Sequence, residues 1–139
     1  MGFYRTPSKS SKYYLPKEDY STAIHYALRY PILLERLNTI ANADTGKALT
    51  YDKDKVNSSN LSDSTAKTAM LRAELTEKIN KILTSLKEVT DTEEEENYLK
   101  LHVCFGLNFW QLENEGMKCG EYRFSNMRQH FYYTLAQKI

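Results

Sequence analysis

The C-terminal quarter of the chain holds the side chains best suited to recognising another molecule. They combine cations, amides, a hydroxyl, an acid and one aromatic ring: Lys118, Glu121, Tyr122, Arg123, Ser125, Asn126, Arg128 and Gln129. Arginine and lysine contact phosphates or guanine edges, and asparagine and glutamine pair with adenine edges. This set predicts a surface that binds double-stranded DNA. The helical register also brings Arg128 near the inward face, so a structural role is open for that residue.

The elements around this set have the outline of a helix-turn-helix. Asn108 can cap a short helix that ends at Gly116, because glycine accepts the left-handed backbone at a helix end. Gly120 then opens a second helix, whose inward face carries Phe124, Met127 or Arg128, Phe131 and Leu135. In a helix-turn-helix the second helix lies in the DNA major groove. A capped helical hairpin with an aromatic core is the alternative that spacing alone leaves open.

Catalytic chemistry finds little support in the sequence. His25, His102 and His130 are isolated, and each is expected to be a partly buried, hydrogen-bonded side chain. The acidic run 93–96 is interpreted as a solvated first helical turn, since no histidine stands at ligand spacing. Glycine-rich phosphate loops, paired CxxC motifs and HExxH are absent from the sequence. We therefore expect no enzyme, no catalytic or metal-binding residue and no cofactor.

Composition is that of an ordinary soluble domain. The chain has 139 residues, a net charge of +1 and no apolar run that approaches a membrane span. Lysine and arginine gather near both ends, in residues 1–17 and 117–139, and acids gather in the middle. Cys104 and Cys119 are too few for a disulfide framework, so reduced thiols in a cytoplasm are expected.

The hydrophobic periodicity predicts an all-α fold. A helix begins at Pro16 and ends or kinks at Pro31, and a second short helix follows. The longest helix is expected over 64–89, capped by Ser62 or Asp63. Thr92 and Glu95 form a predicted capping box that opens the next helix. A repeat of apolar residues on the longest helix gives the predicted core: Leu75, Ile79, Ile82 and Leu86.

These elements suggest three regions. Residues 1–12 are expected to form a flexible basic arm. Residues 13–91 form a helical region for dimerisation, with a mobile loop at 42–61, so a homodimer is a possible state. Residues 92–139 form the helix-turn-helix domain.

Several segments also resemble a known family over nearly the whole chain and in the same order. They are Lys12–Lys17, Tyr30-Pro31, Ser62–Ala69 and Cys119–Leu135. The pattern is similar to RinA- or ArpU-like phage transcriptional regulators of Gram-positive prophages and mobile elements. Their C-terminal domain is similar to region 4 of sigma factors.

The resemblance implies a DNA-binding regulator in a bacterial cytoplasm that also contacts RNA polymerase or another host protein. Its recognition helix would be Gly120 to Lys138. The family is richer in arginine where this chain has Glu121, Gln129 and His130. Fewer cations weaken the phosphate contribution to DNA affinity.

Two other functions stay open. One is a phage-encoded protein that inhibits a host machine, of the anti-defence type, on a helix-turn-helix scaffold. The other is a DNA-packaging adaptor that assembles into rings. Salt dependence separates DNA binding from protein binding, because phosphate neutralisation makes affinity fall steeply with salt.

Overall fold

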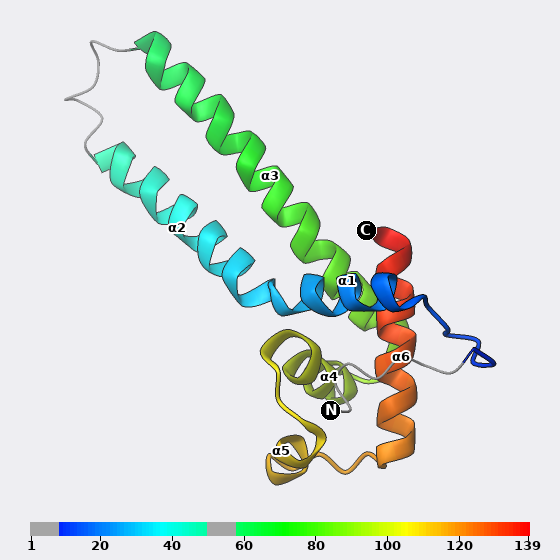
Figure 1. The fold of residues 1–139 in the computed structure, drawn as a ribbon. Coiled ribbons are helices and arrows are strands. Elements are labelled where there is room, and N and C mark those ends of the chain that lie inside the picture. Colours follow the sequence, from blue (N-terminus) through cyan, green and yellow to red (C-terminus); the bar gives the residue numbers. More distant parts are fainter. Residues whose placement is uncertain (1–8, 50–57) are drawn as a thin grey trace. The chain divides into compact units, whose positions relative to one another are not determined.

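A computed structural model describes residues 9–49 and 58–139 of the chain. This part forms six helices and contains no strand (Figure 1). In chain order they are α1 (Lys17–Leu28), α2 (Tyr30–Leu49), α3 (Ser58–Val89), α4 (Glu93–Phe105), α5 (Phe109–Asn114) and α6 (Glu121–Lys138). The predicted all-α class is confirmed, whereas the helix-turn-helix assignment stays a prediction. None of the described helices is both long and apolar enough to cross a membrane.

The chain divides into two compact units. One unit joins Met1–Pro31 with Lys81–Ile139, and the other is Ile32–Asn80. The three regions suggested by the sequence stay a prediction. α1 packs against α4 and α6, and these contacts bring the first helix into the same unit as the C-terminal helices.

Packing of α1 follows from its apolar spacing. Tyr20, Ala23, Ile24 and Ala27 recur at three and four residues and are all buried. Side chains at this spacing share one helix face. The Tyr20 ring meets the Tyr132 ring of α6 edge-on, with centroids 5.2 Å apart. Burial of this face is what holds α1 against α6.

Helix boundaries around α2 and α3 differ from those expected. Arg29 separates α1 from α2, so the break falls at Arg29 and Pro31 lies in the first turn of α2. The predicted loop over 42–61 is wrong for 42–49 and 58–61, which are helical. Its remaining residues, 50–57, lie outside the described residues, as does 1–8 of the predicted flexible arm. The polar composition of 42–49 and 58–61 argues only weakly against helix, because helix propensity is a weak prior that tertiary context overrides.

The longest helix is α3, as predicted, but it begins at Ser58. The predicted cap residues Ser62 and Asp63 therefore lie inside the helix, and that prediction is wrong. The four core residues of the predicted stripe are all buried: Leu75, Ile79, Ile82 and Leu86. Leu71, one turn before Leu75 on the same helix, is exposed.

Candidate interaction surface

Local capping fixes where α4, α5 and α6 begin and end. The Thr92 side chain accepts a hydrogen bond from the Glu95 amide at 3.1 Å, as predicted. The Glu95 carboxylate accepts from the amide of Asp91, one residue earlier than a capping box requires. Asn108 caps α5 in a full capping box with Gln111. Gly116 follows α5 with a positive φ and Gly120 directly precedes α6, as predicted. Gly106 ends α4 in a left-handed conformation.

The predicted DNA-contacting residues are distributed over exposed and partly covered positions. The exposed ones lie at the start of α6 and just before it: Lys118, Glu121, Tyr122, Arg123 and Asn126. Three others are half-buried: Ser125, Arg128 and Gln129. Tyr122 is the most exposed of the large apolar side chains of α6, at 83%. The inward face of the helix is formed by Phe124, Phe131 and Leu135 as predicted.

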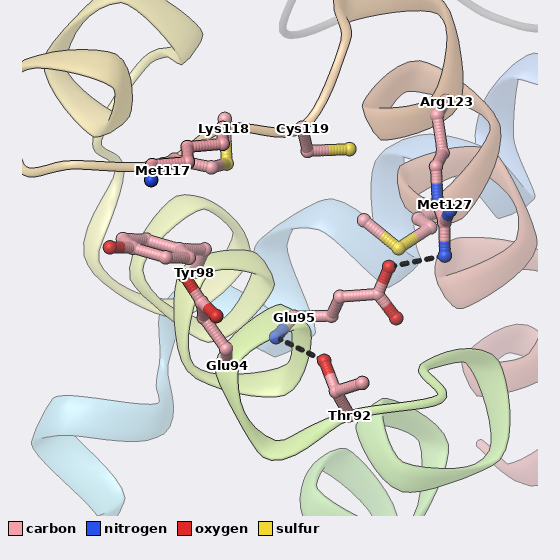
Figure 2. Close-up of a pocket in the computed structure, with 9 residues that line it drawn as sticks. All are labelled: Thr92, Glu94, Glu95, Tyr98, Met117, Lys118, Cys119, Arg123 and Met127. Atoms are coloured by element: carbon pink, nitrogen blue, oxygen red, sulfur yellow. Dashed lines mark hydrogen bonds and ion pairs between the residues drawn. The ribbon is translucent and has the colours of Figure 1, made fainter.

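Arg123 is paired within the chain. Its Nη2 lies 2.5 Å from the Glu95 carboxylate and 3.8 Å from that of Asp91. Figure 2 shows the Glu95 side chain reaching from α4 to this guanidinium. The Glu95 side chain is only 15% exposed, whereas the Arg123 side chain is 61% exposed. Two carboxylates therefore offset the cation that was predicted to meet DNA phosphates.

The other two cations of α6 also have intramolecular partners. Arg128 is half-buried and donates to the Ser125 hydroxyl at 3.4 Å. It also interacts with the Tyr20 hydroxyl, whose pKa is raised by burial and lowered in part by Arg128. Lys138 Nζ lies 2.9 Å from the Glu88 carboxylate of α3. These surroundings favour a structural role for Arg128 over a DNA contact.

A pocket of about 330 Å³ lies beside the Arg123–Glu95 ion pair. We call it the methionine pocket, and Figure 2 shows its lining: Thr92, Glu94, Glu95, Tyr98, Met117, Lys118, Cys119, Arg123 and Met127. The connection between α5 and α6 supplies one wall, and α4 and α6 supply the others. Two backbone-anchored contacts hold that connection. The Met117 amide donates to the Leu112 carbonyl, and the Tyr98 hydroxyl donates to the Glu115 carbonyl.

Sequence reasoning did not find this pocket. Met117 and Met127 are both buried. Tyr98 precedes them by about twenty residues or more on another helix, and no spacing rule connects the three. The pocket exists because α4 contacts both α5 and α6.

Two further pockets adjoin the methionine pocket. One, of about 530 Å³, shares Glu95, Arg123 and Met127 with it. The other, of about 470 Å³, lies at the junction of α3 and α4 and shares Thr92. The lining of the three pockets is called here the acidic surface. It carries five carboxylates and three cations: Asp91, Glu93, Glu94, Glu95 and Glu96 against Lys87, Lys118 and Arg123.

The N-terminal segment borders this surface. Tyr13 lines the 530 Å³ pocket and stacks on His130 of α6, with ring centroids 4.4 Å apart. The Lys12 ammonium lies 5.1 Å from the centre of the Tyr13 ring. Burial and the nearby Lys12 charge both lower the pKa of His130. His130 is half-buried, as expected, and this burial disfavours its charged form.

The remaining histidines and cysteines differ in how far they are buried. His102 is buried, and its Nδ1–H donates to the Leu107 carbonyl at 2.6 Å. Burial lowers its pKa to about 4. His25 is exposed, so the expectation that it is partly buried is wrong. Cys104 is a core residue as expected, and burial raises its pKa to about 12. Cys119 is half-buried, and neither cysteine is in a disulfide.

Within the described residues, no three histidine, cysteine or acidic side chains lie close enough to hold a metal ion. The acidic surface instead offers exposed carboxylates, an exposed tyrosine and an apolar pocket. Comparison with known proteins adds nothing to this description, since no family model, curated protein or solved structure matches the chain.

Proposed function

We propose that the chain is a non-catalytic protein-binding module, of the kind that inhibits or redirects a larger machine. The acidic surface is its interaction site, and the partner contributes a cationic segment. One observation carries the proposal: the three lysine and arginine side chains of α6 are all paired within the chain. Phosphate neutralisation needs cations that are available to the partner. A surface richer in carboxylates is complementary to a basic protein segment.

The proposal can be tested by site-specific photocrosslinking in bacterial cells. A benzoylphenylalanine at position 122 replaces an exposed side chain, and the same group at position 70 of α3 serves as the control. We expect protein crosslinks at position 122 that are absent at position 70. Glu93→Lys should weaken them, whereas Glu113→Lys, an exposed charge reversal on α5, should leave them unchanged. Equal crosslinking at both positions, or crosslinks to nucleic acid, would contradict the proposal.

A second candidate is the DNA-binding transcriptional regulator implied by the family resemblance. The observation that favours it is the exposure of Arg123, because surface ion pairs contribute only about 0–1 kcal/mol. A phosphate could therefore compete with Glu95 and Asp91 for the guanidinium. Lys118 and Asn126 are exposed beside it and could contact phosphate and adenine.

Salt dependence of DNA binding separates the two candidates. Fluorescence anisotropy of labelled duplexes, taken from DNA upstream of the gene, should be measured from about 50 to 200 mM salt. A regulator would bind with an affinity that falls steeply with salt, and Arg123→Ala would reduce both affinity and slope. The protein-binding proposal expects no saturable binding even at the low end of this range. Saturable, salt-dependent binding that Arg123→Ala abolishes would replace our proposal with the regulator.

A further inference from the structure

We propose that the methionine pocket takes one aromatic side chain of the partner, flanked in the partner sequence by lysine or arginine. The inference rests on the protein-binding function proposed above and specifies the chemistry of its ligand. It joins two observations that stand separately. The first is the apolar interior of the pocket, and the second is the acidic lining of the pockets beside it.

The interior of the pocket suits an aromatic ring in size and in chemistry. Its volume of about 330 Å³ exceeds the roughly 150 Å³ of an engineered cavity that binds benzene. Met117 and Met127 form its sulfur-containing walls, and Tyr98 adds an aromatic one. Methionine is flexible and makes favourable contacts with ring edges, so such walls adapt to an inserted ring. Aromatic pairs add a further preference for offset or edge-on packing.

The charges at the rim of the pocket do not call for a charged ligand. Glu94 and Glu95 are balanced by Lys118 and Arg123, and the closest of these groups, Glu95 and Arg123, already pair. Insertion of a carboxylate or an ammonium would have to compete with that pair. An uncharged ring leaves it intact, so the methionine pocket selects for an apolar anchor.

Selection for basic flanks comes from the neighbouring pockets. The pocket at the α3–α4 junction carries Asp91, Glu93 and Glu96 with Lys87 as its one cation, and it shares Thr92 with the methionine pocket. The 530 Å³ pocket carries Asp91 and Glu95 against Arg123. A residue next to the anchor in the partner chain therefore meets excess negative charge on either side. Lysine or arginine there is favoured through charge complementarity.

Methionine methyl NMR of the full chain tests the proposal directly. The probe is a blocked lysine-tryptophan-lysine tripeptide, titrated into protein labelled at the methionine methyl groups. We expect saturable shifts of the Met117 and Met127 methyls and no shift for Met70, which is 73% exposed on α3. Met127→Leu removes one signal for assignment while keeping the volume, and should change Kd by less than about threefold.

Matched peptides and variants separate the two parts of the inference. Lysine-alanine-lysine should give no saturable shift, and glutamate-tryptophan-glutamate should bind at least about fivefold more weakly than the lysine-flanked probe. Glu93→Lys should weaken the lysine-flanked probe by a similar factor, whereas Glu113→Lys should not. Cys119→Phe, which places a ring at the pocket wall, should compete with the probe and reduce its affinity.

The outcomes that overturn the inference are specific. If Met70 shifts as much as Met117 and Met127, or if the alanine peptide binds as tightly as the tryptophan peptide, the pocket does not bind an aromatic side chain. If the lysine-flanked and glutamate-flanked tryptophan peptides bind equally, the proposed preference for basic flanking residues is wrong. If the tryptophan peptide does not bind but crosslinking at position 122 persists, this inference alone is overturned. If crosslinking is absent, the protein-binding proposal is overturned, and with it the protein partner assigned to the pocket here.

Discussion

His102 illustrates how one buried side chain organises the connection between two helices. It lies in the last turn of α4, and its Nδ1–H reaches the carbonyl of Leu107, which follows the helix. Its ring also meets the Phe124 ring of α6 edge-on at 5.2 Å. The uncharged imidazole therefore links the end of α4 to the residues before α5. A proton added at this site would place a charge in the core.

Acid should weaken the fold through this residue. The pKa of His102 is about 4 in the folded chain and about 6.5 unfolded, so the unfolded state binds the proton more readily. Its contribution to stability is complete above the unfolded pKa and is lost as pH falls toward 4. We expect the free energy of unfolding to drop by about 2 kcal/mol between about pH 7.5 and 5.

Urea unfolding followed by circular dichroism measures this change. His102→Gln keeps a donor for the Leu107 carbonyl but cannot titrate, so it serves as the control. The pH dependence that the variant retains comes from other groups, such as the carboxylates, and is subtracted from that of the wild type. The wild type should lose about 2 kcal/mol more than this variant over the same interval. Parallel pH profiles for the two proteins would show that His102 is not the group responsible.

Residue types in α6 could be predicted from the sequence, but their pairing could not. Periodicity correctly separated the inward Phe124 and Phe131 from the exposed Tyr122 and Asn126. It carried no information about which acid meets Arg123, because Glu95 is 28 residues away on another helix. The availability of a cation depends on such contacts. Composition therefore suggested a DNA-facing helix that the tertiary pairing makes less suitable.

At the scale of elements, helix ends are set by local conformations that single residues can adopt. Gly106 ends α4 with φ of 78°, a left-handed angle that costs other L-residues about 1–2 kcal/mol. A Cβ added at Gly106 meets nothing within 4 Å, so any cost of substitution is conformational. Substitutions at Gly106 therefore measure the cost of the left-handed backbone conformation that ends α4.

Gly106→Ala should destabilise the chain by about 1 kcal/mol. Gly106→Asn should cost less, because asparagine tolerates the left-handed region better than alanine does. Chemical denaturation of the three proteins gives the comparison. An asparagine variant no more stable than the alanine variant would mean that the backbone conformation is not the source of the loss.

Truncation of a core side chain of α3 should destabilise the chain more than the Gly106 substitutions do. Ile82 is fully buried, and truncation of such a side chain to alanine costs about 2–5 kcal/mol. Met70→Ala, on the same helix but exposed, should stay within about 0.5 kcal/mol of the wild type. Thermal and urea unfolding of both variants tests the difference. Similar losses at the two sites would show that Ile82 does not pack as described.

Elements were predictable where the signal is local. The caps at Thr92, Asn108 and Gly120 each depend on a few neighbouring residues, and all three were identified from sequence. The ends of α2 and α3 were misplaced, because polar residues with weak helix propensity extend both helices. Propensity differences of a few tenths of a kcal/mol per residue do not fix a boundary.

At the scale of the whole molecule, net charge conceals how charge is distributed. The chain is nearly neutral at +1, yet the start of α6 is bordered by an excess of carboxylates. The acids come from the α3–α4 junction and the first turn of α4, where they also complement the helix dipole. One acidic segment thus stabilises α4 locally and gives the neighbouring helix its electrostatic surroundings. Both proposals above depend on this second consequence.

Uneven burial along α3 leads to a prediction about its local stability. Of the residues whose side chains are described, 65–74 include none that is buried, whereas Leu75, Ile79, Ile82 and Leu86 are buried. Backbone amides open locally where few apolar contacts hold a segment. The hydrogen-exchange protection of this one continuous helix should therefore rise from residues 65–74 to residues 82–89.

Hydrogen-exchange mass spectrometry with overlapping peptides measures this gradient. A peptide spanning 99–105 of α4, which contains the buried Leu99, Val103 and Cys104, provides the reference for a packed helix. Residues 82–89 should exchange at a rate close to that reference, and residues 65–74 should exchange faster, because their opening leaves the buried contacts in place. Uniform protection along α3 would mean that the helix opens as one cooperative unit. In that case the exposed half would depend on contacts that the burial pattern does not reveal.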